Sequence, residues 1–249
     1  MKNAEAWKPT KFNIDNGKLT ASTDTAYVHA GSWLIVDIIA SFYQENISKH
    51  ARGSLIDLGC GNVPLYASYK DFVEKIVCVD WQHSVHGVSY LDFECDLNKR
   101  LPFGNAEFDT VILSDVLEHV ADPAHLWMEI ARMLRLNGKL LMNVPFYYGI
   151  HERPYDYYRY TEYALKRFAE LAGLNIILLK PMGGSLEILT DLVAKHLEPV
   201  PIVGMFFSKL ISRVVRAFHK TALGNRLSIK TGHWFPLGYF LIAEKAELP

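Results

Sequence analysis

The sequence predicts a doubly wound α/β fold with a seven-stranded sheet and a helical insert before the last strand. Strand-like and helix-like segments alternate between about residues 53 and 180, which is typical of βαβ units on a parallel sheet. The apolar runs are short and rich in Val, Ile and Leu, as expected of strands buried on both faces. The predicted strands cover residues 54–58, 75–79, 110–113, 139–144 and 175–179, with a closing strand at 237–244.

Helix ends can also be read from the sequence. Asp122 is a typical N-cap followed by proline at the first helical position, and Thr161 is a second typical N-cap. Glycines at 138 and 173 end the two helices that follow these caps. We therefore predict an N-terminal helical cap (1–52), a core (53–180), a helical insert or lid (181–236) and a closing strand (237–249).

The composition excludes several classes of protein. The chain of 249 residues is 50% hydrophobic and has a formal net charge of −1, so the charge balance gives no case for a nucleic-acid partner. Cys60, Cys78 and Cys95 are too few for a disulfide framework and form no CxxC pair. With no apolar N-terminal run and no uninterrupted apolar stretch of about 18 residues, we expect a cytoplasmic protein without a spanning helix.

The strongest functional signal is the segment Leu-Ile-Asp-Leu-Gly-Cys-Gly at residues 55–61. An apolar strand ends beside Asp57 and runs into a turn whose glycines let a ligand approach the backbone. A carboxylate at this place would repel a pyrophosphate but suits a cationic ligand. The third glycine of a dinucleotide-binding loop (GxGxxG) is absent, because Pro64 stands in its place. A glycine turn with a purely structural role is the alternative for this motif taken alone.

Further carboxylates follow the next strands. Asp80 ends the second strand, where an acid can accept hydrogen bonds from two ribose hydroxyls. Asp96 precedes another turn, and Ser114 ends the strand that leads to His119. Open α/β sheets bind ligands at the carboxyl ends of their strands, so these side chains are expected at one site.

Five motifs, taken in order along the chain, resemble those of class I S-adenosylmethionine (SAM)-dependent methyltransferases of the type-11 group, which have a Rossmann-like fold. They are DLGCG, VCVD, CDL…LPF, FDTVILSDVLEHVADP and LRLNGKLLMNVP. The resemblance covers about residues 53–180 and implies SAM as the cofactor. It places the methionyl part at Asp57, Gly59 and Gly61, with Cys60 in the same cofactor-binding turn. It places the ribose at Asp80, the adenine at Trp81, Asp96 and Leu97, and the ammonium at Ser114. The loop with Val63 and Pro64 resembles a subgroup with a shortened first helix.

The segment HERPYDYYRYT at residues 151–161 resembles the H-E-x-P-x-D-Y-Y-R-Y-T segment of bacterial methyltransferases, many of them in cell-surface polysaccharide or lipid-linked glycan pathways. Its polar and aromatic residues suit a hydroxylated acceptor, which Tyr157, Arg159 and Tyr160 would orient. His151 or Asp156 would take the acceptor's proton. The alternative is a structural plug in which Arg159 pairs with Asp156.

Two groups of histidines require a choice of role. His119 lies where the SAM sulfonium is expected, and it would act either as a general base or as a support for its loop. His83 and His86 have the spacing of a metal pair, but the surrounding sequence offers no partner ligands, and a solvated loop is the simpler interpretation. We predict no metal site.

The insert contains a basic amphipathic segment at residues 202–222, with Lys209, Arg213, Arg216 and Lys220 on one face. It could act as a lid or make peripheral contact with an anionic membrane. The predicted function is O-methylation of a hydroxylated small-molecule, glycan or lipid-linked acceptor. The alternatives are a SAM-binding module without turnover and a dinucleotide-dependent oxidoreductase, and the sequence does not decide the oligomeric state.

Overall fold

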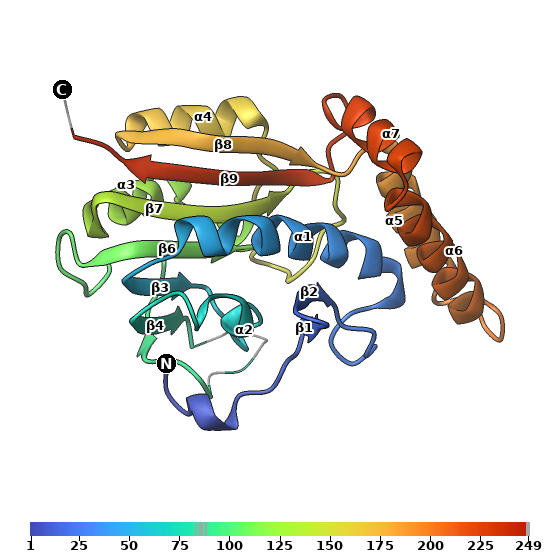
Figure 1. Cartoon of the computed structure of the whole chain (residues 1–249), viewed down its shortest axis with the longest axis horizontal. Coiled ribbons are helices and arrows are strands. Elements are labelled where there is room, and N and C mark those ends of the chain that lie inside the picture. Colours follow the sequence, from blue (N-terminus) through green and yellow to red (C-terminus); the bar gives the residue numbers. More distant parts are fainter. Residues whose placement is uncertain (83, 85–86, 88, 248–249) are drawn as a thin grey trace. The chain divides into compact units, whose positions relative to one another are not determined.

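The structure is a computed structural model that describes residues 1–82, 84, 87 and 89–247 (Figure 1). His83 and His86, which have the spacing of a metal pair, lie outside the described residues. The chain forms two compact units. Unit 1 comprises Met1–Lys8, Glu45–Lys180 and Tyr239–Pro249, and unit 2 comprises Pro9–Gln44 and Pro181–Gly238.

The sheet of unit 1 has seven strands in the order β5-β4-β3-β6-β7-β9-β8, which confirms the predicted fold class. The strands are β3 (Ser54–Leu58), β4 (Lys75–Asp80), β5 (Phe93–Glu94), β6 (Phe108–Ser114), β7 (Leu134–Pro145), β8 (Leu174–Met182) and β9 (Gly238–Lys245). Strands β5, β4, β3, β6 and β7 are parallel to one another, whereas β9 runs in the opposite direction (Figure 1). Asp57 pairs in register with Cys78 and Ile112, so β3, β4 and β6 end at one edge.

The helices of unit 1 include the two that the caps Asp122 and Thr161 predict, and the first of these ends at Met133, before the predicted stop at Gly138, which lies in a strand. The helices are η1 (Ala4–Ala6), α2 (Tyr66–Tyr69), η3 (Leu117–His119), α3 (Pro123–Met133) and α4 (Glu162–Leu171). The Asp122 carboxylate accepts the His125 N–H at 3.1 Å, and the Thr161 hydroxyl accepts the Ala164 N–H at 3.2 Å, so both N-caps are confirmed. The short α2 agrees with the shortened first helix that Pro64 implies.

The core of unit 1 lies between the sheet and the two helices α3 and α4 (Figure 1). Trp127 of α3 stacks on Phe168 of α4 with ring centroids 6.3 Å apart. The fully buried strand residues are aliphatic or aromatic, among them Ile56, Leu58, Val111, Leu113, Leu140 and Leu241. Burial of this apolar surface is the main contribution to the stability of the sheet, and it fixes the strand ends that carry the polar residues.

Unit 2 contains a hairpin that the sequence analysis did not predict. Residues 1–52 were expected to form a helical cap, but β1 (Phe12–Asp15) and β2 (Lys18–Ala21) precede η2 (Ala30–Ser32) and α1 (Trp33–His50). The two turn residues, Asn16 and Gly17, both have positive φ angles, of 49° and 75°. An Asn-Gly pair is the preferred turn of a two-residue hairpin, so the signal was present in the sequence.

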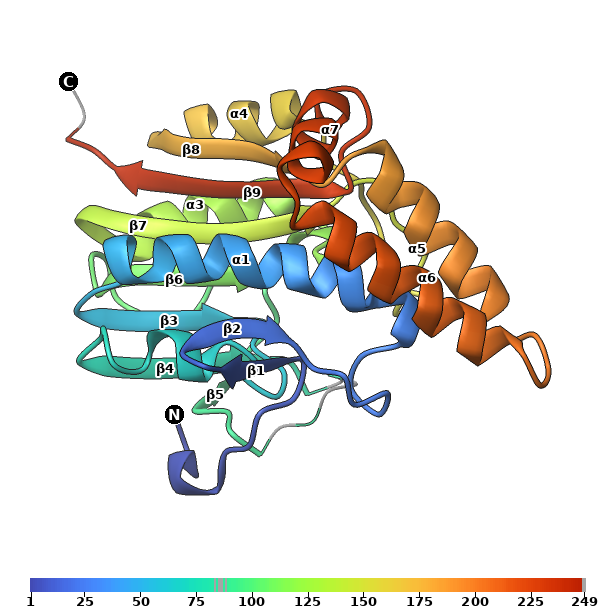
Figure 2. The ribbon, with the colours of Figure 1, turned by 45° about the vertical axis from the view of Figure 1, so that its right-hand side comes forward.

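The insert forms three helices, α5 (Ser185–Leu197), α6 (Gly204–His219) and α7 (Ala222–Gly232) (Figure 2). The last of these, α7, was not predicted from the sequence. Its buried positions are Gly224, Ser228 and Gly232, so this helix packs through small residues and lacks the apolar periodicity that identifies other helices. Among the described residues, none of the helices combines the length and the apolar character needed to cross a membrane.

The basic residues of α6 are partly engaged within unit 2. The Arg216 guanidinium contacts the Asp37 carboxylate at 2.5 Å, and the Arg213 guanidinium lies 5.9 Å from the centre of the Trp33 ring. The sequence analysis grouped these arginines with Lys209 and Lys220 as one basic face. Arg216 instead joins α6 to α1 of the same unit, which reduces the charge that this face offers to a ligand.

Candidate active site

The first part of the site is the turn after β3. Gly59 has a φ angle of 67°, and a Cβ atom there would lie 2.6 Å from a methyl group of Val116. Gly61 and Val63 also have positive φ angles, of 51° each. Val63 therefore adopts the backbone conformation that a third glycine would use, although a β-branched residue rarely does so. The turn keeps the geometry of a glycine loop with only two glycines.

Asp57 is buried at the centre of this turn, with 3% of its surface exposed. The Tyr69 hydroxyl donates a hydrogen bond of 2.9 Å to its carboxylate. Burial raises the pKa of Asp57 to about 7; the Tyr69 hydrogen bond opposes this shift and the nearby Asp80 adds to it. A buried carboxylate in this state gains most from a cationic ligand, which suits the predicted place of Asp57 beside the methionyl part of SAM.

Asp80 lies across the turn from Asp57 and helps to shape it. Its carboxylate accepts the N–H groups of Gly61 at 2.8 Å and Trp81 at 2.7 Å. The Cys60 N–H is bonded to the Val79 carbonyl at 3.1 Å, and the Cys60 side chain is buried. Cys60 thus helps to form the turn, and its contact with the cofactor stays a prediction.

The remaining predicted cofactor residues lie at neighbouring strand ends and turns. Asp96 is bonded to Asn98 and Lys99, and although partial burial acts in the opposite direction, these contacts hold the pKa of Asp96 below its ordinary value. Leu97 belongs to the apolar core, and the Ser114 hydroxyl donates to the Asn143 side chain at 2.8 Å. The Trp81 ring makes an edge contact with Tyr155 at 4.7 Å between centroids, so the cofactor side and the 151–161 segment meet.

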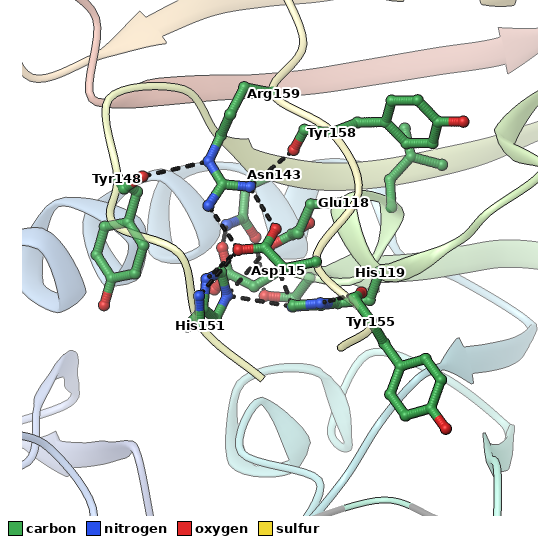
Figure 3. Close-up of polar contacts among 12 residues, drawn as sticks. Asp115, Glu118, His119, Asn143, Tyr148, His151, Tyr155, Tyr158 and Arg159 are labelled. Carbon is green, nitrogen blue, oxygen red and sulfur yellow. Dashed lines mark hydrogen bonds and ion pairs between the residues drawn. The ribbon is translucent and has the colours of Figure 1, made fainter. Parts of the chain in front are cut away.

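Hydrogen bonds attach the 151–161 segment to η3 and the residues beside it, and both backbone N–H groups and side-chain hydroxyls of the segment donate them (Figure 3). The Glu118 carbonyl accepts the N–H groups of Tyr157 at 2.9 Å and Tyr158 at 3.3 Å. The Tyr160 hydroxyl donates to the Leu117 carbonyl at 2.9 Å, and the Tyr158 hydroxyl donates to the Ala121 carbonyl at 3.0 Å. Of the tyrosines predicted to orient the acceptor, Tyr160 is buried and structural, whereas Tyr157 is exposed.

Asp156 and Arg159 form an ion pair inside this segment. The two guanidinium nitrogens of Arg159 contact the Asp156 oxygens at 2.5 and 2.8 Å, and the His151 N–H donates to the same carboxylate at 2.9 Å. The hydrogen bonds from Arg159 lower the pKa of Asp156 to about 2, although burial opposes this effect. A carboxylate of such low basicity is a poor proton acceptor, so the geometry gives Asp156 a positioning role and agrees with the pairing that defined the structural plug.

His119 and His151 face each other, although they are far apart in the sequence (Figure 3). Their Nε2 atoms are 3.1 Å apart, and both rings lie beside the fully buried carboxylate of Glu118. Burial and the neighbouring His119 lower the pKa of His151 despite the opposing charge of Asp156. Glu118 was not predicted as a site residue. Its position immediately before His119 in the SDVLEH motif was the available signal.

Residues 56–142 match the family described as "Methyltransferase domain". The match begins in the strand that carries Asp57 and ends in β7, so it covers the donor edge of the site. The chain is a class I SAM-dependent methyltransferase. Its cofactor is therefore SAM, and the dinucleotide-dependent alternative is set aside. The subgroup defined by the 151–161 segment remains a prediction.

Known proteins resemble this methyltransferase at low sequence identity. The ubiquinone biosynthesis O-methyltransferases of Coxiella burnetii (strain Dugway 5J108-111) and Neisseria meningitidis serogroup C (strain 053442) are 23% and 26% identical to it over 169 and 180 residues. These matches cover 61% and 63% of the chain and 69% and 72% of the relatives. A SAM-dependent methyltransferase from Archaeoglobus fulgidus has a similar fold, with a TM-score of 0.53 and 16% identity over 85% of this chain and 93% of that one.

Proposed function

We propose that this methyltransferase transfers the SAM methyl group to a hydroxyl oxygen of a small-molecule, glycan or lipid-linked acceptor. The observation that carries the proposal is the juxtaposition of two histidine side chains with the donor edge. The 151–161 segment holds His151 against His119, and Tyr155 of the same segment contacts Trp81 of the donor edge. The two named relatives are O-methyltransferases, which supports an oxygen acceptor and a small molecule as its class.

Different residues of the site would bind the methyl donor and the acceptor. The turn at Asp57, Gly59 and Asp80 would hold the donor, while the exposed Tyr157 and the His119–His151 pair would meet the acceptor. Because the sulfonium is already activated, most of the rate enhancement would come from holding the acceptor oxygen in line with the methyl group. The histidine pair would assist the loss of the hydroxyl proton. The Arg159–Asp156 pair would fix His151 in this position.

The test compares turnover and SAM binding in the same variants. His151→Gln is expected to lower kcat at least tenfold with SAM affinity within twofold of wild type, because general acid–base catalysis contributes about 10²–10⁴-fold. His233→Gln, an exposed histidine of unit 2, is the matched control and should behave as wild type. Acceptors would be small phenols and extracted lipid-linked glycans, assayed by release of S-adenosylhomocysteine. Unchanged turnover in folded His151→Gln would contradict the proposal.

We further propose that α6 makes peripheral contact with membranes that hold such an acceptor. Phe206 and Phe207 are 64% and 43% exposed, and Ile202 just before the helix is fully exposed. Since Arg216 is paired with Asp37, the attachment would depend on apolar insertion more than the charge pattern alone predicts. Phe206→Ser/Phe207→Ser is expected to abolish sedimentation with anionic liposomes, whereas Lys230→Gln on α7 should not. Equal sedimentation of wild type and the double variant with anionic liposomes would show that these two side chains do not carry the attachment, and no sedimentation of the wild type would leave α6 as a lid.

A further inference from the structure

The geometry points to a divalent metal site formed by Glu118, His119 and His151, which would bind a first-row transition-metal cation such as Zn²⁺. One nitrogen of each histidine and one oxygen of the carboxylate lie within 4.8 Å of one another. The sequence analysis assigned no metal to these residues. This inference rests on the proposed function, because it names what would activate the acceptor hydroxyl there.

The first argument is the tautomer that the protein imposes on each histidine. The His119 Nδ1 lies 3.0 Å from the Tyr155 carbonyl oxygen, and the His151 Nδ1 lies 3.2 Å from the Gly149 carbonyl oxygen. Carbonyl oxygens only accept hydrogen bonds, so each contact places the ring proton on Nδ1. In the neutral state both Nε2 atoms then carry lone pairs, and these lone pairs point at one another.

The second argument is the distance between these two lone pairs. Two neutral Nε2 acceptors at 3.1 Å repel each other unless a positive species lies between them. With metal–nitrogen distances of about 2.0–2.1 Å, two nitrogens of a tetrahedral zinc site are roughly 3.3 Å apart. The observed separation is therefore close to that of two histidines on one cation. The only other species small enough is a shared proton.

The third argument is the carboxylate. The Glu118 Oε1 lies 3.8 Å from the His119 Nε2 and 4.0 Å from the His151 Nε2, and the Glu118 side chain is completely buried. A movement of about half an ångström would bring it to the spacing of a third tetrahedral ligand. Two histidines and one glutamate are a ligand set of catalytic zinc sites, which keep a fourth position open.

The surroundings of the cluster also suit a metal. Ligating histidines usually donate their second N–H to a carbonyl or a carboxylate, which fixes the ring. His119 does so to Tyr155, and His151 does so to Gly149, with the Asp156 carboxylate 3.3 Å away. The His151 side chain is 29% exposed, so the open position can be reached by an acceptor.

The site would act on the acceptor before methyl transfer. The acceptor hydroxyl would bind the open position, and its proton would leave to water because the cation lowers the hydroxyl pKa. The oxygen would then form a bond to the SAM methyl carbon while the carbon–sulfur bond breaks. The electron pair of that bond stays on sulfur and gives neutral S-adenosylhomocysteine. No oxidant or reductant is needed.

The test titrates Zn²⁺ into the full-length chain after chelator treatment and measures binding by calorimetry. Co²⁺ is titrated in parallel, and its visible absorption reports tetrahedral ligation. We expect one equivalent of either metal per chain. His151→Gln and Glu118→Gln should each lower the Zn²⁺ affinity at least tenfold. His233→Gln should bind as wild type. Melting temperatures would identify a variant that fails to fold, and the partly exposed His151 leaves a usable variant if Glu118→Gln does not fold.

Two results would overturn the inference. One is the absence of saturable Zn²⁺ binding in the wild-type chain, which would mean that the imidazoles share a proton. The other is an unchanged Zn²⁺ affinity in a folded His151→Gln variant. The proposed function is tested separately by SAM calorimetry and turnover without added metal. Turnover without zinc binding would contradict only the metal site. Zinc binding without methyl transfer to any hydroxyl acceptor would contradict the proposed function and leave the metal site supported.

Discussion

The donor edge and the 151–161 segment each contain a carboxylate that hardly contacts solvent, and they hold its charge in opposite ways. Asp57 at the donor edge has the neutral Tyr69 hydroxyl as its partner, and burial raises its pKa to about 7. Asp156 is bound by the Arg159 guanidinium, which lowers its pKa to about 2. The difference indicates that the charge of Asp57 is left for a cationic ligand, whereas that of Asp156 is neutralised within the protein.

The largest expected effect concerns the internal ion pair. Asp156→Asn should lower the free energy of unfolding by about 3 kcal/mol at pH 7, because removing one partner leaves the Arg159 charge without its counterion. Urea denaturation measures this change. The matched control is Glu170→Gln, which breaks an exposed pair with Arg167 and should change stability by less than about 0.5 kcal/mol. Equal effects of the two substitutions would mean that Asp156 is not a structural anchor.

The second prediction tests the donor edge through Asp80. Asp80→Ala should weaken SAM binding by about 1.5–3 kcal/mol, because it removes a charged hydrogen-bond acceptor and loosens the turn at Gly61. Calorimetry with SAM is the measurement. Asp71→Ala, an exposed acid after α2, should leave the affinity unchanged. Unchanged affinity in Asp80→Ala would move the ribose site away from β4.

The third prediction uses the raised pKa of Asp57. A cationic ligand binds the ionised carboxylate, so SAM affinity should fall about tenfold between pH 8 and pH 6, which is about 1.4 kcal/mol. The raised pKa of Asp57 also makes the free energy of unfolding depend on pH. A carboxyl whose folded pKa lies above its unfolded value is most stabilising at low pH and loses this contribution as pH rises toward 7. Asp57→Asn should therefore flatten the SAM profile and raise the melting temperature at pH 8. A flat profile in the wild type would contradict this assignment.

The smallest expected effect separates two adjacent tyrosines. Tyr158→Phe removes a hydrogen bond to Ala121 and should lower stability by about 1 kcal/mol with kcat/KM unchanged. Tyr157→Phe leaves the exposed ring in place and should raise KM for the acceptor a few-fold with stability unchanged. Thermal unfolding and acceptor kinetics on both variants measure the two effects. A loss of stability in Tyr157→Phe with an unchanged KM would instead support the structural plug.

Local sequence patterns were sufficient for the core and the donor edge. The caps at Asp122 and Thr161 and the glycine turn after β3 depend on residues within a few positions of one another. The apolar strands are recognisable because they are buried on both faces. Strand ends of a parallel sheet share one edge, so Asp57 and Asp80 could be placed together before the fold was known.

Other elements were missed for reasons that the structure makes clear. Helix α7 packs through Gly224, Ser228 and Gly232, so its buried face has no apolar period. The basic pattern of α6 could not reveal that Arg216 pairs with Asp37, which is 179 positions away. Long-range partners leave no periodic signal in a single sequence, and each one depends on how whole elements pack.

The sequence by itself therefore determined the fold class, from the alternation of strands and helices, and the carboxylates at the strand ends, while its resemblance to a methyltransferase family indicated the SAM-dependent chemistry. Only the tertiary structure decided the roles on the acceptor side. It paired Asp156 with Arg159, buried Tyr160, and brought the Nε2 atoms of His119 and His151 to 3.1 Å beside Glu118. That arrangement depends on a loop after β7 folding back onto η3, and the physical reason is the set of backbone hydrogen bonds to Glu118, which no local pattern encodes.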